Sequence, residues 1–271
     1  RAKSIQVATA VTPDNGLVIA APSEGGYQIR RLSGRDGKSL WRVPAPDALP
    51  RLTSLSDDLL LAGGMSFGEA FDAGNQAQAA HPSVRAIKLA DGATAWQWPS
   101  PHPGTLTVVG LVGDTAILAS INPKQIRYYR LDAQGNAKML FALPSQDVQA
   151  TVRSGVLITR EHLPVEHLVG RDALSGKLLW QRPIPRQPQY FPYGYDLAGA
   201  PSMAGGKLLL GTTEALVVLD ISTGQSKRFA LPTDGINTTF WPYQLAFTGD
   251  GRLTGVVTNT GAVVVKGHPV G

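Results

Sequence analysis

The chain of 271 residues is 43% apolar and 17% charged, which suits a folded core and excludes an intrinsically disordered chain. It contains no cysteine, which excludes disulfides, thiol nucleophiles and cysteine-ligated metals. The formal charge of +5 is scattered along the sequence, so we interpret it as a solvated surface and expect no nucleic-acid partner. No apolar run has the length of a membrane span, so we expect no transmembrane segment in this chain.

Short apolar or alternating runs, bounded by Gly, Asp, Asn and Pro, predict strands along the whole chain. In chain order, the first twelve are expected at Ile5–Val11, Leu17–Ala21, Tyr27–Leu32, Ser39–Val43, Leu52–Leu55, Leu59–Ala62, Val84–Leu89, Thr94–Trp98, Leu106–Leu111, Ala116–Ser120, Ile126–Leu131 and Lys138–Ala142. The others are expected at Val148–Val152, Val156–Thr159, His167–Arg171, Leu178–Arg182, Ala200–Met203, Lys207–Gly211, Leu216–Asp220, Ser226–Ala230, Tyr243–Thr248, Leu253–Val257 and Ala262–Lys266. The last group of strands therefore lacks a fourth member, which we expect to come from outside residues 1–271 or from another chain.

A short sequence motif recurs among these strands: a turn that contains Gly, followed by a bulky residue four positions after the Gly. It joins Gly37 to Trp41, Gly92 to Trp96 and Gly176 to Trp180. Weaker copies join Gly135 to Met139, in the Trp position, and Gly224 to Phe229, one place late. A strand-rich repeat of roughly 40–45 residues is typical of a propeller. We therefore predict an all-β fold in one domain, residues 1–271: a β-propeller of about six four-stranded antiparallel blades, or seven or eight if the chain is a fragment.

This motif resembles the PQQ-like, or quinoprotein-type, propeller repeat. The resemblance is strongest at Leu89–Trp96, Leu131–Met139, Asp172–Trp180 and Leu219–Phe229, and looser at Leu32–Trp41. The resemblance implies that the Trp of each outermost strand packs between neighbouring blades, a structural interblade role for Trp41, Trp96 and Trp180. Enzymes of this family use a vicinal Cys pair, a calcium ion and an Asp base around the quinone. This chain has no Cys and no dense acidic cluster, so we expect no cofactor and no catalytic residue.

Two aromatic segments precede the first strands of the fifth and sixth blades. They contribute Tyr190, Phe191, Tyr193 and Tyr195, and then Phe240, Trp241 and Tyr243. Because both segments occupy the same position in the repeat, we expect them on one face, near the central channel. Aromatic side chains with a polar tip are favoured in binding sites, so this face is a candidate contact surface for a peptide, a partner loop or a sugar. The alternative is packing between blades.

Two other segments interrupt the repeat. The stretch Ser66–Ser83, with Phe67 and Phe71, replaces a tight hairpin in blade two and is a candidate recognition loop or a tolerated insertion. The stretch Glu161–His167 holds two His and two Glu near a turn, but residues of a strand alternate faces and no third His is close. We interpret it as a solvated hairpin tip and expect no metal.

The noncatalytic branch of the family includes the scaffold lipoprotein of the outer-membrane β-barrel assembly machinery and sensor domains of some bacterial kinases, and the chain resembles this branch. The resemblance implies a periplasmic or cell-surface location and a protein partner. We therefore expect a noncatalytic protein-interaction or ligand-sensing scaffold of the bacterial cell envelope. The alternatives are a PQQ- or metal-dependent oxidoreductase, or the sensor module of a larger receptor or enzyme.

Overall fold

In this computed structural model the described residues are 8–24, 26–45, 51–64, 82–144, 150–161, 167–183, 203–204, 206–211, 215–230, 244–247, 252–258, 261–263 and 268–269. They contain strands and turns and no helix, and the strands form six four-stranded antiparallel sheets. This confirms the all-β prediction. Within the described residues no helix is long and apolar enough to cross a membrane.

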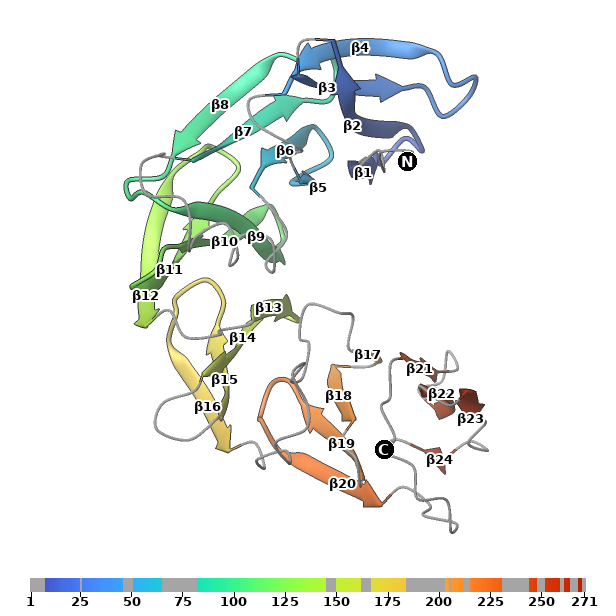
Figure 1. Ribbon diagram of the computed structural model, residues 1–271, viewed down its shortest axis with the longest axis vertical. Coiled ribbons are helices and arrows are strands. Elements are labelled where there is room, and N and C mark those ends of the chain that lie inside the picture. Colours follow the sequence, from blue (N-terminus) through green and yellow to red (C-terminus); the bar gives the residue numbers. More distant parts are fainter. Residues whose placement is uncertain are drawn as a thin grey trace. The chain divides into compact units, whose positions relative to one another are not determined.

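Each sheet takes its strands from one continuous stretch of sequence (Figure 1). Sheets one, two and three contain β1 (Ala8–Val11), β2 (Leu17–Ser23), β3 (Gly26–Leu32), β4 (Ser39–Pro44), β5 (Leu52–Ser54), β6 (Leu59–Gly63), β7 (Ser83–Lys88), β8 (Thr94–Pro99), β9 (Thr105–Val112), β10 (Thr115–Ile121), β11 (Gln125–Leu131) and β12 (Ala137–Pro144). Sheets four and five contain β13 (Ala150–Arg153), β14 (Val156–Glu161), β15 (His167–Asp172), β16 (Leu178–Pro183), β17 (Met203–Ala204), β18 (Lys207–Gly211), β19 (Ala215–Asp220) and β20 (Ser226–Ala230). In each of these five sheets, consecutive strands are neighbours, as hairpin connections require.

The sixth sheet departs from this order. It contains β21 (Gln244–Phe247), β22 (Arg252–Thr258), β23 (Gly261–Val263) and β24 (His268–Pro269). Both β23 and β24 pair with β22, at Val256–Thr258 and at Arg252–Leu253 respectively, so the expected third strand is divided in two. Among the described residues, no strand pairs beyond these two short strands.

A β-bulge lies in the outermost pair of strands in sheets one to four. Each bulge follows the pair formed by an aromatic residue of the fourth strand: Trp41, Trp96, Phe141 and Trp180. The prediction that Met139 holds the Trp position is therefore wrong. In the turn before β12 the Gly135 N–H donates to the Asp132 carbonyl oxygen, three residues earlier, whereas in sheet two the Gly92 N–H donates to the Lys88 carbonyl oxygen, four residues earlier. Strand β12 then continues further than β8 before its bulge. Phe141 stacks on Tyr128 with ring centroids 4.8 Å apart, whereas Met139 is 52% exposed.

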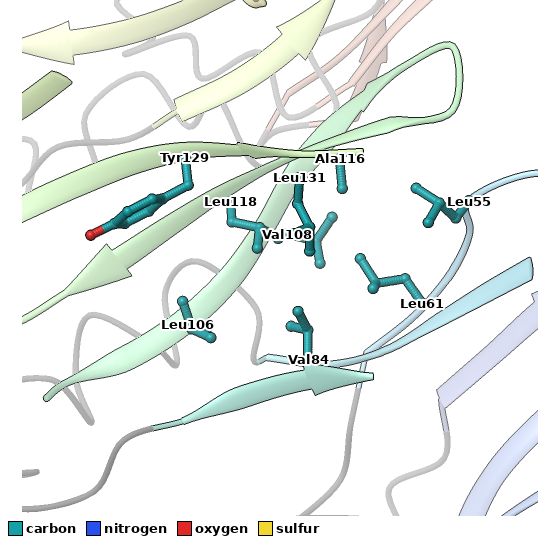
Figure 2. Packing of buried hydrophobic residues seen from close by; sticks show 9 residues of the cluster. All are labelled: Leu55, Leu61, Val84, Leu106, Val108, Ala116, Leu118, Tyr129 and Leu131. Carbon is teal, nitrogen blue, oxygen red and sulfur yellow. The ribbon is translucent and has the colours of Figure 1, made fainter. Parts of the chain in front are cut away.

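The chain forms two compact units, Arg1–Gln146 with Ala173–Ser175, and Asp147–Asp172 with Gly176–Gly271. In the first unit one apolar cluster joins sheets one and two, and another joins sheets two and three. Figure 2 shows the second cluster, in which Leu61 and Val84 of sheet two face Leu118 and Leu131 of sheet three. In the second unit a cluster around Trp180 joins sheets four and five. The assignment of the whole chain to one domain stays a prediction.

Candidate interaction surface

Every complete sheet has two ends that differ in their connections. At the end that we call the turn end, tight turns join the first strand to the second and the third to the fourth. In sheet three these turns follow Val112 and Leu131, and the register places both at one end of the sheet. The opposite end, which we call the loop end, carries the connection from second to third strand and the link to the next sheet. Variable segments therefore gather at the loop end.

The turn end holds neighbouring sheets together through an indole ring. Trp41 Nε1 of sheet one donates a 2.8 Å hydrogen bond to the Leu89 carbonyl oxygen of sheet two. The same ring covers Gly92, where a Cβ would lie 2.9 Å from it. Corresponding contacts join Trp96 with Ala133 and Gly135, and Trp180 with Ile221 and Gly224. All three glycines have positive φ, so only glycine both forms the turn and admits the ring.

Arginine side chains strengthen the same end. Arg31 donates to the Leu89 carbonyl oxygen, which therefore accepts two hydrogen bonds, and its other terminal nitrogen lies 2.6 Å from the Asp14 carboxylate. The Thr12 hydroxyl and then Arg31 lower the pKa of Asp14. In the second unit Arg182 Nε donates to the Gly224 carbonyl oxygen at 2.7 Å. The turn end is thus occupied by contacts that hold the sheets in place.

The link between sheets two and three shows how a described segment lies at the loop end. The Ser100 hydroxyl donates to the His102 carbonyl oxygen at 2.8 Å and lies 3.4 Å from the Ser120 hydroxyl of β10. Gly104 comes so close that a Cβ would lie 2.2 Å from the Ile121 carbonyl oxygen. This link therefore packs against the end of the second strand of the next sheet.

The candidate residues from the sequence lie in three other connections between strands. Tyr190, Phe191, Tyr193 and Tyr195 follow β16 and precede β17, and Phe240, Trp241 and Tyr243 follow β20 and precede β21. Phe67 and Phe71 lie between β6 and β7. All nine residues lie outside the described residues, so their role in binding stays a prediction.

The described part of the Glu161–His167 hairpin is an ion-pair site. Arg171 Nη1 lies 2.5 Å from Glu161 Oε1, and the buried Thr159 hydroxyl donates to the same oxygen at 2.7 Å. In the strand register His167 of β15 lies opposite Glu161 of β14. Residues 162–166 lie outside the described residues. Within the part of the chain that the structure describes, no three His, Cys, Asp or Glu side chains are grouped as metal ligands.

Two buried polar groups of β11 were not predicted. Within the described part of the chain, Tyr129 Oη and Arg127 Nη1 are buried without a hydrogen-bond partner, while Arg127 Nη2 donates to Gln125 at 2.9 Å. Tyr129 is 5.3 Å from Trp98 between ring centroids, and burial raises the pKa of its hydroxyl. In Figure 2 this hydroxyl points away from Leu131. The sequence gives no signal for these groups, because sheet two supplies the burial.

Six four-stranded antiparallel sheets, each from one continuous stretch of sequence, with indole joints at three of the turn ends, are the architecture of a β-propeller protein. A family model described as outer membrane protein assembly factor BamB matches residues 2–126 and 132–266. The chain belongs to this family, which confirms the resemblance inferred from the repeat. No curated protein matches the chain.

Three solved structures are similar to the chain, each at 13% sequence identity. The computationally designed Ika8 protein matches with a TM-score of 0.56 over 98% of this chain and 72% of its own. The Dos1 propeller matches with a TM-score of 0.54 over 94% of this chain and 65% of its own. BamB from Moraxella catarrhalis matches with a TM-score of 0.40 over 94% and 82%. The likeness to the Dos1 propeller supports the propeller fold.

Proposed function

We propose that the protein is a noncatalytic protein-interaction scaffold of the bacterial cell envelope that takes part in the assembly of outer-membrane proteins. The single observation that carries this proposal is the match of the assembly-factor family model to residues 2–126 and 132–266. The protein would act in the periplasm or at the cell surface. Its mechanism is affinity: a rigid fold presents loops to a partner segment.

The difference between the two ends of the sheets supports the loop end as the contact surface. At the turn end, indole and guanidinium groups are engaged in contacts between sheets. In chain order the seven aromatic candidates belong to the links that follow β16 and β20, and the described links between sheets leave from the loop end. Tyr and Trp are the residue types that most often dominate binding energy. We therefore assign the aromatic segments around Phe191 and Trp241 to partner binding.

A capture experiment tests this proposal. The parent protein and the Phe191→Ala, Trp241→Ala double variant are immobilised and exposed to detergent-solubilised bacterial envelope. A matched control carries Leu40→Ala and Leu179→Ala, two exposed positions on outer strands. Circular dichroism and a melting curve first show that all three proteins are folded.

We expect parent and control to retain the same outer-membrane assembly protein and the aromatic double variant to lose it. Loss of that protein from the control alone would contradict the placement at the loop end. Retention by all three proteins would show that the aromatic segments do not bind the partner. If no assembly protein is retained by the parent, the scaffold function itself is wrong.

A further inference from the structure

Two polar side chains of β11 lie on the face of sheet three that packs against sheet two. Arg127 and Tyr129 are two residues apart on one strand and therefore share a face. Tyr129 belongs to the apolar cluster that joins sheets two and three, and its ring centroid is 5.3 Å from that of Trp98 on β8. Both sheets belong to the first compact unit. The two side chains thus lie at an interface whose two sides are both described.

Each of these side chains carries a buried polar atom without a hydrogen-bond partner among the described residues. The atoms are Arg127 Nη1 and Tyr129 Oη. The guanidinium has one neutral acceptor, the side-chain oxygen of Gln125 on the same strand, which lies 2.9 Å from Arg127 Nη2. Proteins leave few buried donors unpaired, and a functional role or a bound ion is a common reason for those that remain.

The guanidinium of Arg127 also lacks a counterion among the described residues. Arg31 and Arg171 are half-buried like Arg127, but they pair with the carboxylates of Asp14 and Glu161 respectively. In sheets two and three, all described carboxylates lie in the tight turns of the turn end: Asp57, Asp58, Asp91, Asp114 and Asp132. None of them forms an ion pair with Arg127. A cation that is partly removed from water is costly unless an anion joins it.

The two groups together match the acceptors of a carboxylate. A guanidinium can donate two parallel hydrogen bonds to a carboxylate, and such charge-assisted bonds are roughly twice as strong as bonds to a neutral amide. The Tyr129 hydroxyl supplies a further donor. Burial raises the pKa of this hydroxyl, so it keeps its proton at neutral pH. A carboxylate would therefore outcompete the amide oxygen of Gln125 for the guanidinium.

We propose that Arg127 and Tyr129 bind the carboxylate group of a ligand, which displaces the Gln125 side chain from the guanidinium and accepts a hydrogen bond from the Tyr129 hydroxyl. The ligand reaches the guanidinium from solvent, because Arg127 and Gln125 are only half-buried. A carboxylate side chain of a partner protein and a small free carboxylate offer the same chemistry. The site is separate from the aromatic segments of the proposed function and does not depend on them.

The binding test uses the purified protein and three probes at constant ionic strength: acetyl-Ala-Glu-Ala-amide, the same peptide with Gln in place of Glu, and sodium acetate. We expect the Glu peptide, and not the Gln peptide, to shift the indole N–H resonance of Trp98. Tighter binding of the Glu peptide than of acetate would assign the site to a partner's side chain, and equal binding would assign it to a small free carboxylate. Equal responses to the Glu and Gln peptides would overturn the proposal.

Three variants separate this site from general attraction to a basic protein. Arg127→Met and Tyr129→Phe should each weaken binding of the Glu peptide about tenfold or more. Lys124→Gln removes an exposed cation three residues before Arg127 and should leave binding within about twofold. A loss of binding in Lys124→Gln as large as that in Arg127→Met would overturn the proposal.

A melting curve without any probe supplies an independent measurement. Because the Tyr129 hydroxyl has no partner among the described residues, Tyr129→Phe should melt at a temperature no lower than the parent. The Glu peptide should raise the melting temperature of the parent and not that of Tyr129→Phe. A probe-free Tyr129→Phe protein that melts several degrees below the parent would show that the hydroxyl is already hydrogen-bonded, and would overturn the proposal.

Discussion

At the scale of single residues, the joint between sheets depends on an indole that both fills space and donates a hydrogen bond. Trp180 is buried, its Nε1 lies 2.8 Å from the Ile221 carbonyl oxygen, and its ring covers Gly224. Burial of an aromatic side chain and satisfaction of a buried carbonyl oxygen contribute separately to stability. Substitutions that remove the hydrogen bond alone, or the hydrogen bond and the buried ring together, can therefore be compared.

We predict that Trp180→Phe lowers the free energy of unfolding by about 1 kcal/mol through the lost hydrogen bond, and that Trp180→Ala lowers it by about 3–5 kcal/mol. Urea denaturation followed by circular dichroism measures both. Leu179→Ala, at a neighbouring exposed position, is the control and should change stability by less than about 0.5 kcal/mol. A Trp180→Ala protein as stable as the control would contradict the role of the ring.

Gly224 gives a second prediction at this scale. Its φ is +67° and a Cβ would lie 2.5 Å from the Trp180 ring, whereas Gly206, with a φ of +76°, has no atom within 4 Å of such a Cβ. Both Gly→Ala changes cost about 1–2 kcal/mol for the left-handed backbone, and only Gly224→Ala adds a clash. We expect Gly224→Ala to melt at a lower temperature than Gly206→Ala. The difference should disappear when both changes are made in Trp180→Ala, as a double-mutant cycle can show.

Asp220 predicts how stability depends on pH. Hydrogen bonds from the Ser222 hydroxyl, the Thr223 backbone N–H and Lys207 lower the pKa of its carboxyl below 3.8. Because the pKa is lower in the folded state, the carboxylate stabilises the fold above the unfolded pKa of about 4, and this contribution is lost as the pH falls through the folded pKa. Between about pH 5 and 2.5, the parent should lose more stability than Asp220→Asn. Parallel stability curves for the two proteins would refute this.

At the scale of elements, the bulge in the fourth strand decides which aromatic side chain turns inward. In sheet three this residue is Phe141, which stacks on Tyr128, while Met139 lies on the exposed part of the strand. We predict that Phe141→Ala lowers the free energy of unfolding by about 3 kcal/mol or more and that Met139→Ala changes it by less than about 0.5 kcal/mol. If chemical denaturation instead showed a larger loss for Met139→Ala than for Phe141→Ala, Met139 would hold the Trp position, as its spacing from Gly135 predicts.

This element also shows how far the sequence can be interpreted. Alternating apolar runs and turn glycines are local signals, so the strands of sheets one to five and the turns at Gly37, Gly92 and Gly176 could be predicted. The position of a bulge depends on the length of the preceding turn and on pairing with another strand, so counting four residues from Gly135 pointed to Met139. The division of the last expected strand into β23 and β24 likewise depends on pairing, here with β22.

The candidate site was predictable only in part, for the same reason. The aromatic segments stand out because Tyr and Phe are concentrated between predicted strands. By contrast, Arg127 and Tyr129 are two of many alternating strand residues, and their lack of partners depends on how sheet two packs against sheet three. Contacts between sheets depend on the strand register, which the sequence alone does not supply.

At the scale of the whole molecule, the turn ends hold neighbouring sheets together within each unit, and we propose that the loop end contacts a partner. The three indole joints serve the first role, and the aromatic connections are assigned to the second. The family match gives the biological setting in which a partner is sought. We therefore infer that the protein contacts an envelope protein through the loop end.

Site-specific photo-crosslinking in living bacteria shows which end of the sheets contacts an envelope protein. A photoreactive phenylalanine analogue is placed at Phe191 or Trp241, the positions that we assign to the loop end, and at Leu40 or Leu179 near the turn end, one position at a time. We predict that the loop-end positions crosslink to one outer-membrane assembly protein and that the turn-end positions do not. Crosslinks confined to the turn-end positions, or no crosslink to an assembly protein from Phe191 and Trp241, would show that the loop end does not contact the partner.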